Sequence, residues 1–252
     1  MAESRHRPTQ GVVDHFEARA ERYNLSSRWV SDAAMGAQVA EWLELQPAHR
    51  QLDVACGTGL WARNFHGRVG ELVGLDLTPG MFEQAREHVD TLVQGSAEDM
   101  PFPDDSFDRV TERQGIQFMD AARAVEEMVR VAKPGGRVCL AQLCAYGQQD
   151  AAEYFEILAL RNPARRNFFV REDLETLLRQ AGCRDVVVHP WISDEDVGRW
   201  ADNGAIADER QAAIARCYAE ASPAFQDLHA VRTEAGQILD RMLFGVAIGV
   251  KG

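Results

Sequence analysis

The chain has 252 residues, of which 46% are hydrophobic and 26% charged, and its formal net charge is −12. This length and composition suit one α/β domain with a sizeable core and exclude a disordered chain. The acidic balance disfavours nucleic acid and anionic membranes as partners. The five cysteines contain no Cys-x-x-Cys pair, the chain has no apolar leader, and no run approaches ~20 apolar residues. We therefore expect a cytoplasmic protein with no metal site and no membrane span.

The first elements along the chain are expected to be helical. Apolar positions recur at helical spacing over Val12–Leu45, with an interruption at Asn24–Ser27. This pattern predicts an N-terminal helical cap over residues 1–48. A core over residues 49–145 and a lid or substrate region over residues 146–252 complete one single domain, residues 1–252.

Beyond the cap, short apolar runs alternate with helical patterns. The expected core strands are Leu52–Cys56, Glu71–Asp76, Asp90–Gln94, Phe107–Glu112 and Arg137–Leu143. The helices expected between them are Leu60–Phe65, Pro79–Val89 and Ala121–Val131. Such alternation predicts βαβ crossovers, and hence a mostly parallel sheet with helices on both faces and ligands at the carboxyl ends of its strands.

The regular alternation of expected strands and helices ends after the fifth strand. Helical stretches are expected at Asp150–Leu160, Arg171–Ala181, Asp194–Ala201 and Glu209–Ala221. The last two strands are expected at Val186–His189 and Met242–Val250. We therefore predict an α/β, Rossmann-like, seven-stranded and mostly parallel sheet, with a helical lid inserted between the last two strands.

The loop Asp53–Gly59 carries two glycines after a buried strand, so backbone amides can approach a ligand closely. The segment Gly57–Ala62 also satisfies the dinucleotide pattern G-x-G-x-x-A. Asp53 helps to separate the two interpretations, because a carboxylate can face a cationic amino-acid group but would oppose a pyrophosphate. Asp53 could also simply cap the turn. Asp76 suits ribose hydroxyls with either ligand.

Several further motifs follow in a fixed order. They are Gly95–Glu98, Pro101–Asp108, Arg113–Asp120 and Lys133–Gly136. With Asp53–Gly59 and Asp76, these motifs resemble the class I methyltransferases of the quinone-methylating type. The resemblance spans about Val12–Leu143 and the unit Arg171–His189. It implies S-adenosylmethionine as cofactor and S-adenosylhomocysteine as its product.

The resemblance also implies which residues contact the cofactor. They are Tyr23, Asp53, Ala55, Gly57, Thr58, Gly59, Asp76, Leu77, Met81, Ser96, Ala97, Glu98, Arg113 and Gln114. The loop would hold the methionine portion, Asp76 the ribose and the turn at Ala97 the adenine, while Arg113 and Gln114 line the pocket near the methyl group. Ser96 stands where the family usually has aspartate, which weakens or removes one contact with the adenine amino group.

Methyl transfer mainly requires alignment and exclusion of water, but an oxygen or carbon acceptor must lose a proton. Many relatives have a histidine after the fourth strand, whereas this chain has Gln117, which cannot act as a base. The candidate catalytic residues are Glu112, His15, Tyr23 and His189. The Glu112 carboxylate either faces the sulfonium or an amine substrate, or bonds a nearby amide. For His15 and His189, a structural or surface role is favoured over catalysis.

The sequence thus predicts methyl transfer to an O, N or C atom of a small molecule, such as a quinone, polyketide or other secondary metabolite. One alternative is a cyclase or lyase that binds the same cofactor on the same fold. Another is a nicotinamide-dependent oxidoreductase, which Asp53 and the lack of a Tyr-x-x-x-Lys pair disfavour. A homodimer is compatible with the sequence.

Two features remain outside these motifs. The basic stretch Arg161–Arg166 is interpreted as a solvated helix end or loop. Four aromatic residues could line an acceptor site or simply pack the core and lid, namely Phe168, Phe169, Trp191 and Trp200.

Overall fold

The computed structural model describes residues 32–204 and 206–252. Most of the predicted cap therefore lies outside the described residues, together with the candidates His15 and Tyr23. The described part of the cap contains helix α2 (Ala33–Trp42). This helix begins after Asp32, whose carboxylate accepts two backbone amides of the first turn at 3.0 Å.

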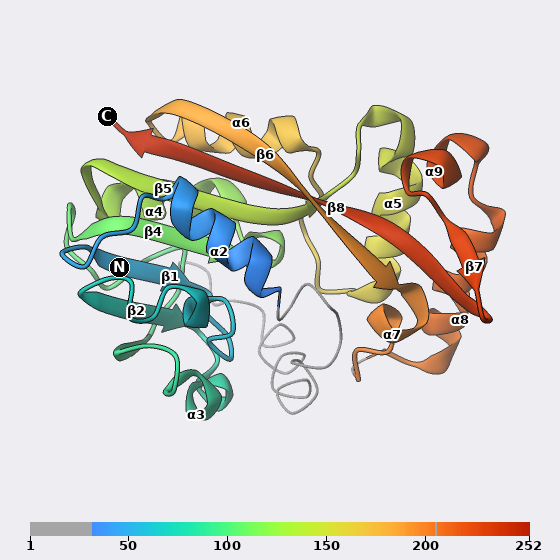
Figure 1. The fold of residues 1–252 in the computed structure, drawn as a ribbon, viewed down its shortest axis with the longest axis horizontal. Helices are drawn as coiled ribbons and strands as arrows, with labels where there is room; N and C mark the ends of the chain where they lie inside the picture. The colour runs from blue at the N-terminus through green and yellow to red at the C-terminus, as the bar shows by residue number, and fades with distance from the viewer. Residues whose placement is uncertain (1–31, 205) are drawn as a thin grey trace, which may run out of the picture.

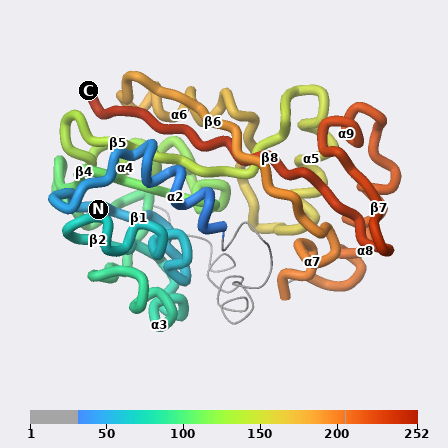
Figure 2. The backbone as a smooth tube through the Cα atoms, viewed as in Figure 1, coloured from blue at the N-terminus to red at the C-terminus, as the bar shows by residue number. Residues whose placement is uncertain are grey.

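A mixed sheet of eight strands forms the centre of the protein (Figures 1 and 2). The strands are β1 (Arg50–Val54), β2 (Glu71–Asp76), β3 (Thr91–Gln94), β4 (Phe107–Arg113), β5 (Ala132–Cys144), β6 (Cys183–Asp196), β7 (Arg232–Glu234) and β8 (Gln237–Lys251). The strand order is β3-β2-β1-β4-β5-β8-β6, and β7 pairs with the first residues of β8. Strands β1 to β5 pair in parallel, whereas β8 is antiparallel to β5 and β6. The predicted mostly parallel sheet is confirmed, and β7 adds a short strand to the seven expected.

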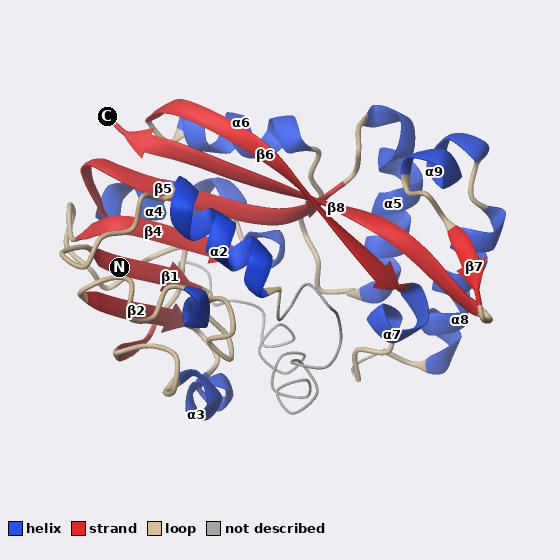
Figure 3. Cartoon of the chain, viewed as in Figure 1, coloured by secondary structure: helices blue, strands red, loops and turns tan. Residues whose placement is uncertain are grey.

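Helices and 3-10 turns cover both faces of the sheet (Figure 3). Besides α2 they are η3 (Ala62–Asn64), η4 (Pro79–Met81), α3 (Phe82–Ala85), η5 (Ile116–Phe118), α4 (Ala121–Val131), α5 (Gln148–Arg161), α6 (Arg171–Gln180), α7 (Val197–Ala201), α8 (Asp208–Glu220) and α9 (Pro223–Leu228). One core cluster joins α2 and the lid helices to the sheet, through residues such as Met35 and Trp200. The other joins α4 and α6 to the opposite face, through residues such as Val125 and Leu174. The two-sided cover is as predicted.

The segment after β1 differs from the prediction. In place of a helix over Leu60–Phe65 there is only the short turn η3. Asn64 supplies the reason, because its side-chain amide donates to the backbone carbonyls of Leu60 and Trp61 at 3.3 and 3.1 Å. These are the carbonyls that a continuing helix would pair with its own amides. The helix predicted at Pro79–Val89 is likewise shorter, consisting of η4 and α3.

Strands β6 and β8 extend past the core toward the lid helices (Figure 1). Residues 194–196 were expected to be helical but belong to β6, because they pair with β8 as far as Asp196 opposite Leu239. Helices α7, α8 and α9 lie between β6 and β8 along the chain, as the predicted insertion requires. In the described ranges, no helix is both long and apolar enough to cross a membrane.

A buried polar cluster, called here the lid anchor, joins the lid to α5. It consists of His229, Asp150, Asp240 and Tyr218, all at most 1% exposed. His229 Nδ1 lies 2.9 Å from Asp240 and Nε2 lies 3.1 Å from Asp150, while the Tyr218 hydroxyl donates to Asp240 at 2.5 Å. Burial opposes a charged ring, but the hydrogen bonds to both carboxylates raise the pKa of His229.

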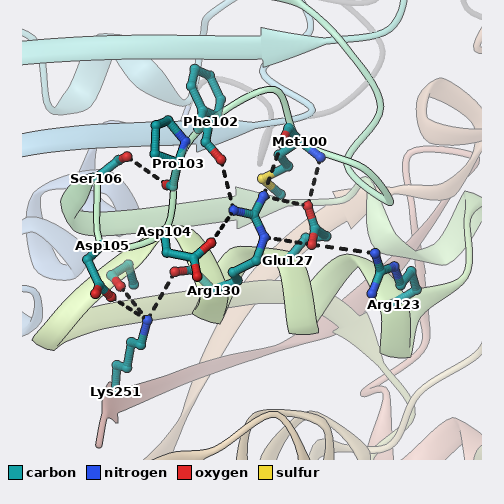
Figure 4. A network of polar contacts seen from close by, with 11 residues as sticks. Met100, Phe102, Pro103, Asp104, Asp105, Ser106, Arg123, Glu127, Arg130 and Lys251 are labelled. Carbon is teal, nitrogen blue, oxygen red and sulfur yellow. Dashed lines mark hydrogen bonds and ion pairs between the residues drawn. The ribbon is translucent and has the colours of Figure 1, made fainter.

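The loop before β4 is fastened to α4 (Figure 4). Arg130 of α4 donates to the backbone carbonyls of Met100 and Phe102 at 3.1 and 2.8 Å. Glu127, one turn earlier, accepts the Met100 amide at 2.8 Å and also binds Arg130. This network holds the preceding turn, Ser96–Glu98, beside the start of α4.

Candidate functional site

The carboxyl ends of β1, β2 and β4 meet at one edge of the sheet. Asp53 of β1 lies between Gly74 of β2 and Thr111 of β4 in the strand register. The loops that follow these strands consequently face one another. Gly115 demonstrates how close they come, because a Cβ added there would lie 2.6 Å from the Cβ of Ala55. The structure therefore brings the predicted cofactor loop and the residues after β4 into one site.

The loop after β1 is shaped by left-handed backbone conformations. Ala55, Gly57 and Gly59 have φ values of 54°, 53° and 77°, which glycine adopts freely and alanine only at a cost. The Asp76 carboxylate braces this loop by accepting the Gly57 amide and the Thr78 amide, both at 2.8 Å. Burial raises the pKa of Asp76 even though these amides favour the charged form. Each carboxylate oxygen retains a lone pair that a ligand hydroxyl can use.

Asp53 is a buried carboxylate with one unused oxygen. Its Oδ1 accepts from the Thr111 hydroxyl at 3.1 Å, whereas its Oδ2 has no hydrogen-bond partner among the described residues. Desolvation raises the pKa of Asp53 to about 7, although Thr111 and the guanidinium of Arg113 oppose the shift. A buried acceptor without a partner is costly unless a ligand satisfies it. This oxygen therefore marks a place for a cationic or hydrogen-bond-donating ligand group.

Glu112 is also buried, but both of its oxygens are engaged. Oε1 accepts the backbone amides of Gly115 and Ile116, the latter at 3.1 Å, and Oε2 accepts the side-chain amide of Gln142 at 2.6 Å. Burial raises the pKa of Glu112 to about 8 despite these bonds. Of the two interpretations of this residue, the geometry favours the amide-binding one, in which Glu112 shapes the loop after β4.

Unpaired polar atoms gather in the loop after β4. Gln114 has φ 58°, and its Oε1 accepts from Gln117 at 3.2 Å. Within the described part of the chain, Gln114 Nε2, Gln117 Oε1 and Trp61 Nε1 have no hydrogen-bond partners. The Arg113 guanidinium lies over the Trp61 ring at 4.7 Å. The close approach of Gly115 to Ala55 and the contact of Arg113 with Trp61 join this loop to the segment after β1, so the site offers both donors and acceptors to a polar ligand.

The turn after β3 holds the three residues predicted to lie near adenine. The Ser96 hydroxyl accepts the Glu98 amide at 3.1 Å, and the Glu98 carboxylate accepts the Asp120 amide at 2.8 Å. Both polar side chains thus stabilise the turn and the start of α4. Ala97 between them is 8% exposed.

The remaining predicted contact residues lie around the same loops. Thr58 and Met81 are both buried, and Leu77 is partly exposed. Gly59 packs against α3, because a Cβ added there would lie 3.0 Å from the Cα of Ala85. The loop after β1 is therefore supported by α3 as well as by Asp76.

His189 is not brought into this site. It shares a row of the sheet with Val246, Ala141 and Arg113, which places three strand spacings between His189 and Arg113. Neighbouring strands lie about 4.8 Å apart, so this separation is roughly 14 Å. The ring stacks on Trp42 at 3.9 Å, and burial lowers its pKa. These contacts favour a packing role for His189.

The dinucleotide interpretation of the glycine loop is also disfavoured. A pyrophosphate is received at the N-terminus of a helix that follows the loop. In the described chain only η3, a turn of three residues, follows this loop before β2. The helix that would receive the pyrophosphate is therefore missing from its expected place.

Sequence reasoning missed Thr111 and Trp61. Thr111 is a fully buried polar residue of β4, and the parallel register with β1 would have placed it next to Asp53. Trp61 lies within the segment Gly57–Ala62, so the glycine motif was the available signal. The proposed aromatic wall is divided, because Phe169 belongs to the core on the α4 side whereas Phe168 and Trp200 belong to the α2 side.

Comparison with known proteins identifies the family of this chain. The pattern of a family described as "Methyltransferase domain" matches residues 52–140. A demethylmenaquinone methyltransferase of Anoxybacillus flavithermus is 31% identical over 217 residues, covering 74% of this chain and 90% of the relative. Another, from Geobacillus kaustophilus, is 30% identical and covers 76% of this chain and 94% of the relative. The crystal structure of the YcgJ protein from Bacillus subtilis has a TM-score of 0.78 at 24% identity, covering 86% of this chain and 98% of that chain.

Proposed function

This chain belongs to the class I S-adenosylmethionine-dependent methyltransferase family, and from that premise we propose that it methylates a small ring compound of the quinone or hydroquinone type. The family confirms the predicted enzyme class and S-adenosylmethionine as the methyl donor. The names of the relatives support the acceptor class, because they act on demethylmenaquinone. The observation that carries the proposed donor site is the unpaired Oδ2 of buried Asp53 beside the glycine loop.

The residues of the loop fit this cofactor. Asp53 Oδ2 would accept from the ammonium group of the methionine portion, which removes an otherwise unpaired buried acceptor. A Cβ added at Gly57 would meet no described residue within 4 Å, so the described part of the chain leaves space beside the loop. Asp76 would receive the ribose hydroxyls on the lone pairs that the Gly57 and Thr78 amides leave free.

The bound cofactor supplies a methyl group made electrophilic by its sulfonium, so the protein has mainly to orient the two reactants. We assign that role to the loop after β4, where Gln114 and Gln117 hold each other at 3.2 Å. Arg113 over Trp61 would close the site toward the core and exclude water.

Removal of a proton from the acceptor would require a general base near the loop after β4. Of the described residues, Glu112 near the end of β4 is bonded to backbone amides, and Gln117 after β4 cannot take a proton. Tyr23 and His15 lie outside the described residues and stay predictions. We therefore propose that the acceptor enters with an oxygen already ionised, so that its own negative charge activates the atom that is methylated.

The test is transfer of an isotopic label. The protein is incubated with S-adenosylmethionine carrying a deuterated methyl group and a panel of benzohydroquinones and naphthohydroquinones, and products are identified by mass spectrometry. We expect a hydroquinone to gain the labelled methyl. Binding of S-adenosylhomocysteine without any labelled ring product would instead favour the cyclase or lyase alternative.

A separate experiment tests the ribose assignment. The variant Asp76→Ala removes the brace of the loop and the proposed hydroxyl acceptor together, so S-adenosylhomocysteine should bind more weakly in calorimetric titration. An unchanged dissociation constant would contradict the assignment.

A further inference from the structure

We propose that Arg165 is the residue that selects the methyl acceptor, by binding a negatively charged oxygen on its ring. This inference rests on the proposed function, because it concerns the acceptor side of the same site. Arg165 belongs to the basic stretch that the sequence suggested was a solvated helix end. The structure gives it different surroundings.

Arg165 lies in the segment between α5 and α6, and most of its surroundings are protein. The side chain is only partly exposed. Desolvation lowers its pKa to about 10, which still leaves the guanidinium charged at neutral pH. The group is therefore a cation surrounded by protein to which solvent retains access.

Among the described residues, no carboxylate neutralises the charge of Arg165. Its guanidinium donates to the Asn167 carbonyl at 3.3 Å and lies 5.6 Å from the Phe168 ring, and it forms no ion pair with a carboxylate of the described chain. The ionisable groups that influence it most are Tyr154 and Cys144. Burial raises the pKa of Cys144 to about 12 and that of Tyr154 well above its usual value, so both are neutral at physiological pH.

The neighbouring Arg161 shows what a structural arginine looks like in this stretch. Its guanidinium lies over the Trp200 ring at 4.5 Å and donates to the Trp200 carbonyl at 3.0 Å. Arg161 thus ties α5 to α7 of the lid. Within the described chain, Arg165 forms no comparable connection between elements, since the hydrogen bond of its side chain reaches the Asn167 carbonyl, only two residues along the chain.

The segment that carries Arg165 is attached to the candidate site. The backbone amides of Arg166 and Asn167 donate to the Gln117 carbonyl at 2.8 and 3.1 Å, and Asn167 also donates to the Ile116 carbonyl at 2.9 Å. Gln117 in turn donates to Gln114, beside the cofactor loop. The arrangement therefore runs from the donor loop, through the loop after β4, to Arg165.

An oxygen anion is the ligand that completes this arrangement. A guanidinium donates planar, charge-assisted hydrogen bonds to an oxyanion. These bonds are stronger than those that it could donate to a neutral oxygen. The acceptor would then carry a negative charge between two cations, Arg165 and the sulfonium of the donor. Because the acceptor oxygen is already ionised, it does not need a general base from the described residues after β4.

The experiment compares two ring probes of the same shape, 2-naphthoate, which is an anion, and 2-naphthamide, which is neutral. Their dissociation constants are measured by calorimetry on protein saturated with S-adenosylhomocysteine. We expect the wild type to prefer 2-naphthoate by about tenfold or more. In Arg165→Gln the preference should vanish, and in Arg165→Lys it should survive in part, because the charge remains but the planar fork is lost.

The matched control is Arg166→Gln, an exposed neighbour that should keep the wild-type preference. The ratio of the two dissociation constants is the readout that a purely structural role would not change. If Arg165→Gln loses its thermal transition, the comparison of Arg165→Lys with wild type decides. Equal affinities in the wild type, or an unchanged preference in both Arg165 variants, would overturn the inference while S-adenosylhomocysteine still binds. Failure of S-adenosylhomocysteine to bind the wild type would overturn the proposed function itself.

Discussion

The lid anchor and the loop after β1 are both buried and polar, but they differ in whether their polar groups have hydrogen-bond partners. In the lid anchor, each ring nitrogen of His229 meets a carboxylate, and Tyr218 binds Asp240 as well. Beside the loop after β1, Asp53 Oδ2 has no partner within the described residues, and neither has Nε2 of Gln114 in the adjoining loop after β4. Satisfied buried networks make a structure rigid, whereas unsatisfied groups carry a cost that a ligand can remove. The contrast assigns stability to the lid anchor and binding to the loop.

The largest expected effect comes from breaking the lid anchor. In His229→Gln, the carboxylates of Asp150 and Asp240 remain buried without the imidazolium between them. The free energy of unfolding should fall by about 3–5 kcal/mol in urea titrations. S-adenosylhomocysteine should still bind with an affinity within about threefold of wild type, since the loop is untouched. His66→Gln is the control, because His66 is about half exposed beside Asp90 and its loss should cost less than about 0.5 kcal/mol. A small loss of stability in His229→Gln would contradict the stabilising role of the lid anchor.

The converse variant is Asp53→Asn. The amide oxygen can still accept from Thr111, but the charge that would face the ammonium group of the cofactor is gone. The dissociation constant of S-adenosylhomocysteine should rise about 30-fold in calorimetric titration. The free energy of unfolding should stay the same or increase, because an unpaired buried charge is removed. The exposed Asp202→Asn serves as control. Wild-type affinity in Asp53→Asn would show that the loop does not use this carboxylate.

The pH dependence of stability should separate the two regions. The pKa of Asp53 is raised from 3.8 to about 7, so the folded state holds a proton that the unfolded state releases, and stability falls as pH rises between those values. The raised pKa of His229 gives a contribution that is complete below 6.5 and is lost as pH rises through the folded-state value. Asp53→Asn should flatten the acid part of the profile and His229→Gln the alkaline part, in urea unfolding from about pH 4 to pH 9.

Affinity for S-adenosylhomocysteine should increase as pH rises, whereas the contribution of Asp53 to the stability of the fold decreases. As pH rises through about 7, Asp53 ionises and binds the cationic ligand better. Wild-type affinity should therefore increase across neutral pH, and this increase should disappear in Asp53→Asn. An identical pH profile in both proteins would contradict the assignment. Glu112 also has a raised pKa, so part of the stability slope should remain in the variant.

The smallest expected effect comes from a pair of glycines with similar backbone angles. Gly59 has φ 77° and Gly135 has φ 75°, but a Cβ at Gly59 would lie 3.0 Å from Ala85, whereas one at Gly135 would meet no atom of the described ranges within 4 Å. Both alanine variants carry the left-handed strain, and only Gly59→Ala adds a clash. Gly59→Ala should therefore cost about 1 kcal/mol more than Gly135→Ala in urea unfolding. Equal costs would mean that α3 shifts freely away from the loop.

The sequence predicted those parts of the fold that depend on local pattern. Glu71–Asp76 and Ala121–Val131 match β2 and α4 residue for residue. The helix expected after β1 was wrong because a single side chain, Asn64, takes up the carbonyls that the helix needs. Periodicity of apolar residues does not contain that information.

The sequence could predict those site residues that lie at the end of a strand, as Asp53 and Asp76 do. The role of Glu112 stayed open because it depends on Gln142, which β4–β5 pairing brings within 2.6 Å from 30 residues away. The surroundings of Arg165 were hidden for a related reason. A basic stretch is solvated by default, and only the docking of its backbone on Gln117 surrounds the side chain with protein.

Strand β8 has a consequence for how the protein is made. It lies between β5 and β6, yet it follows both along the chain. During synthesis, β5 and β6 therefore leave the ribosome as strands with open edges, and the lid helices emerge before the strand that joins them. Unpaired edges of this kind invite association with other chains. Completion of the sheet therefore has to wait until β8 has been synthesised.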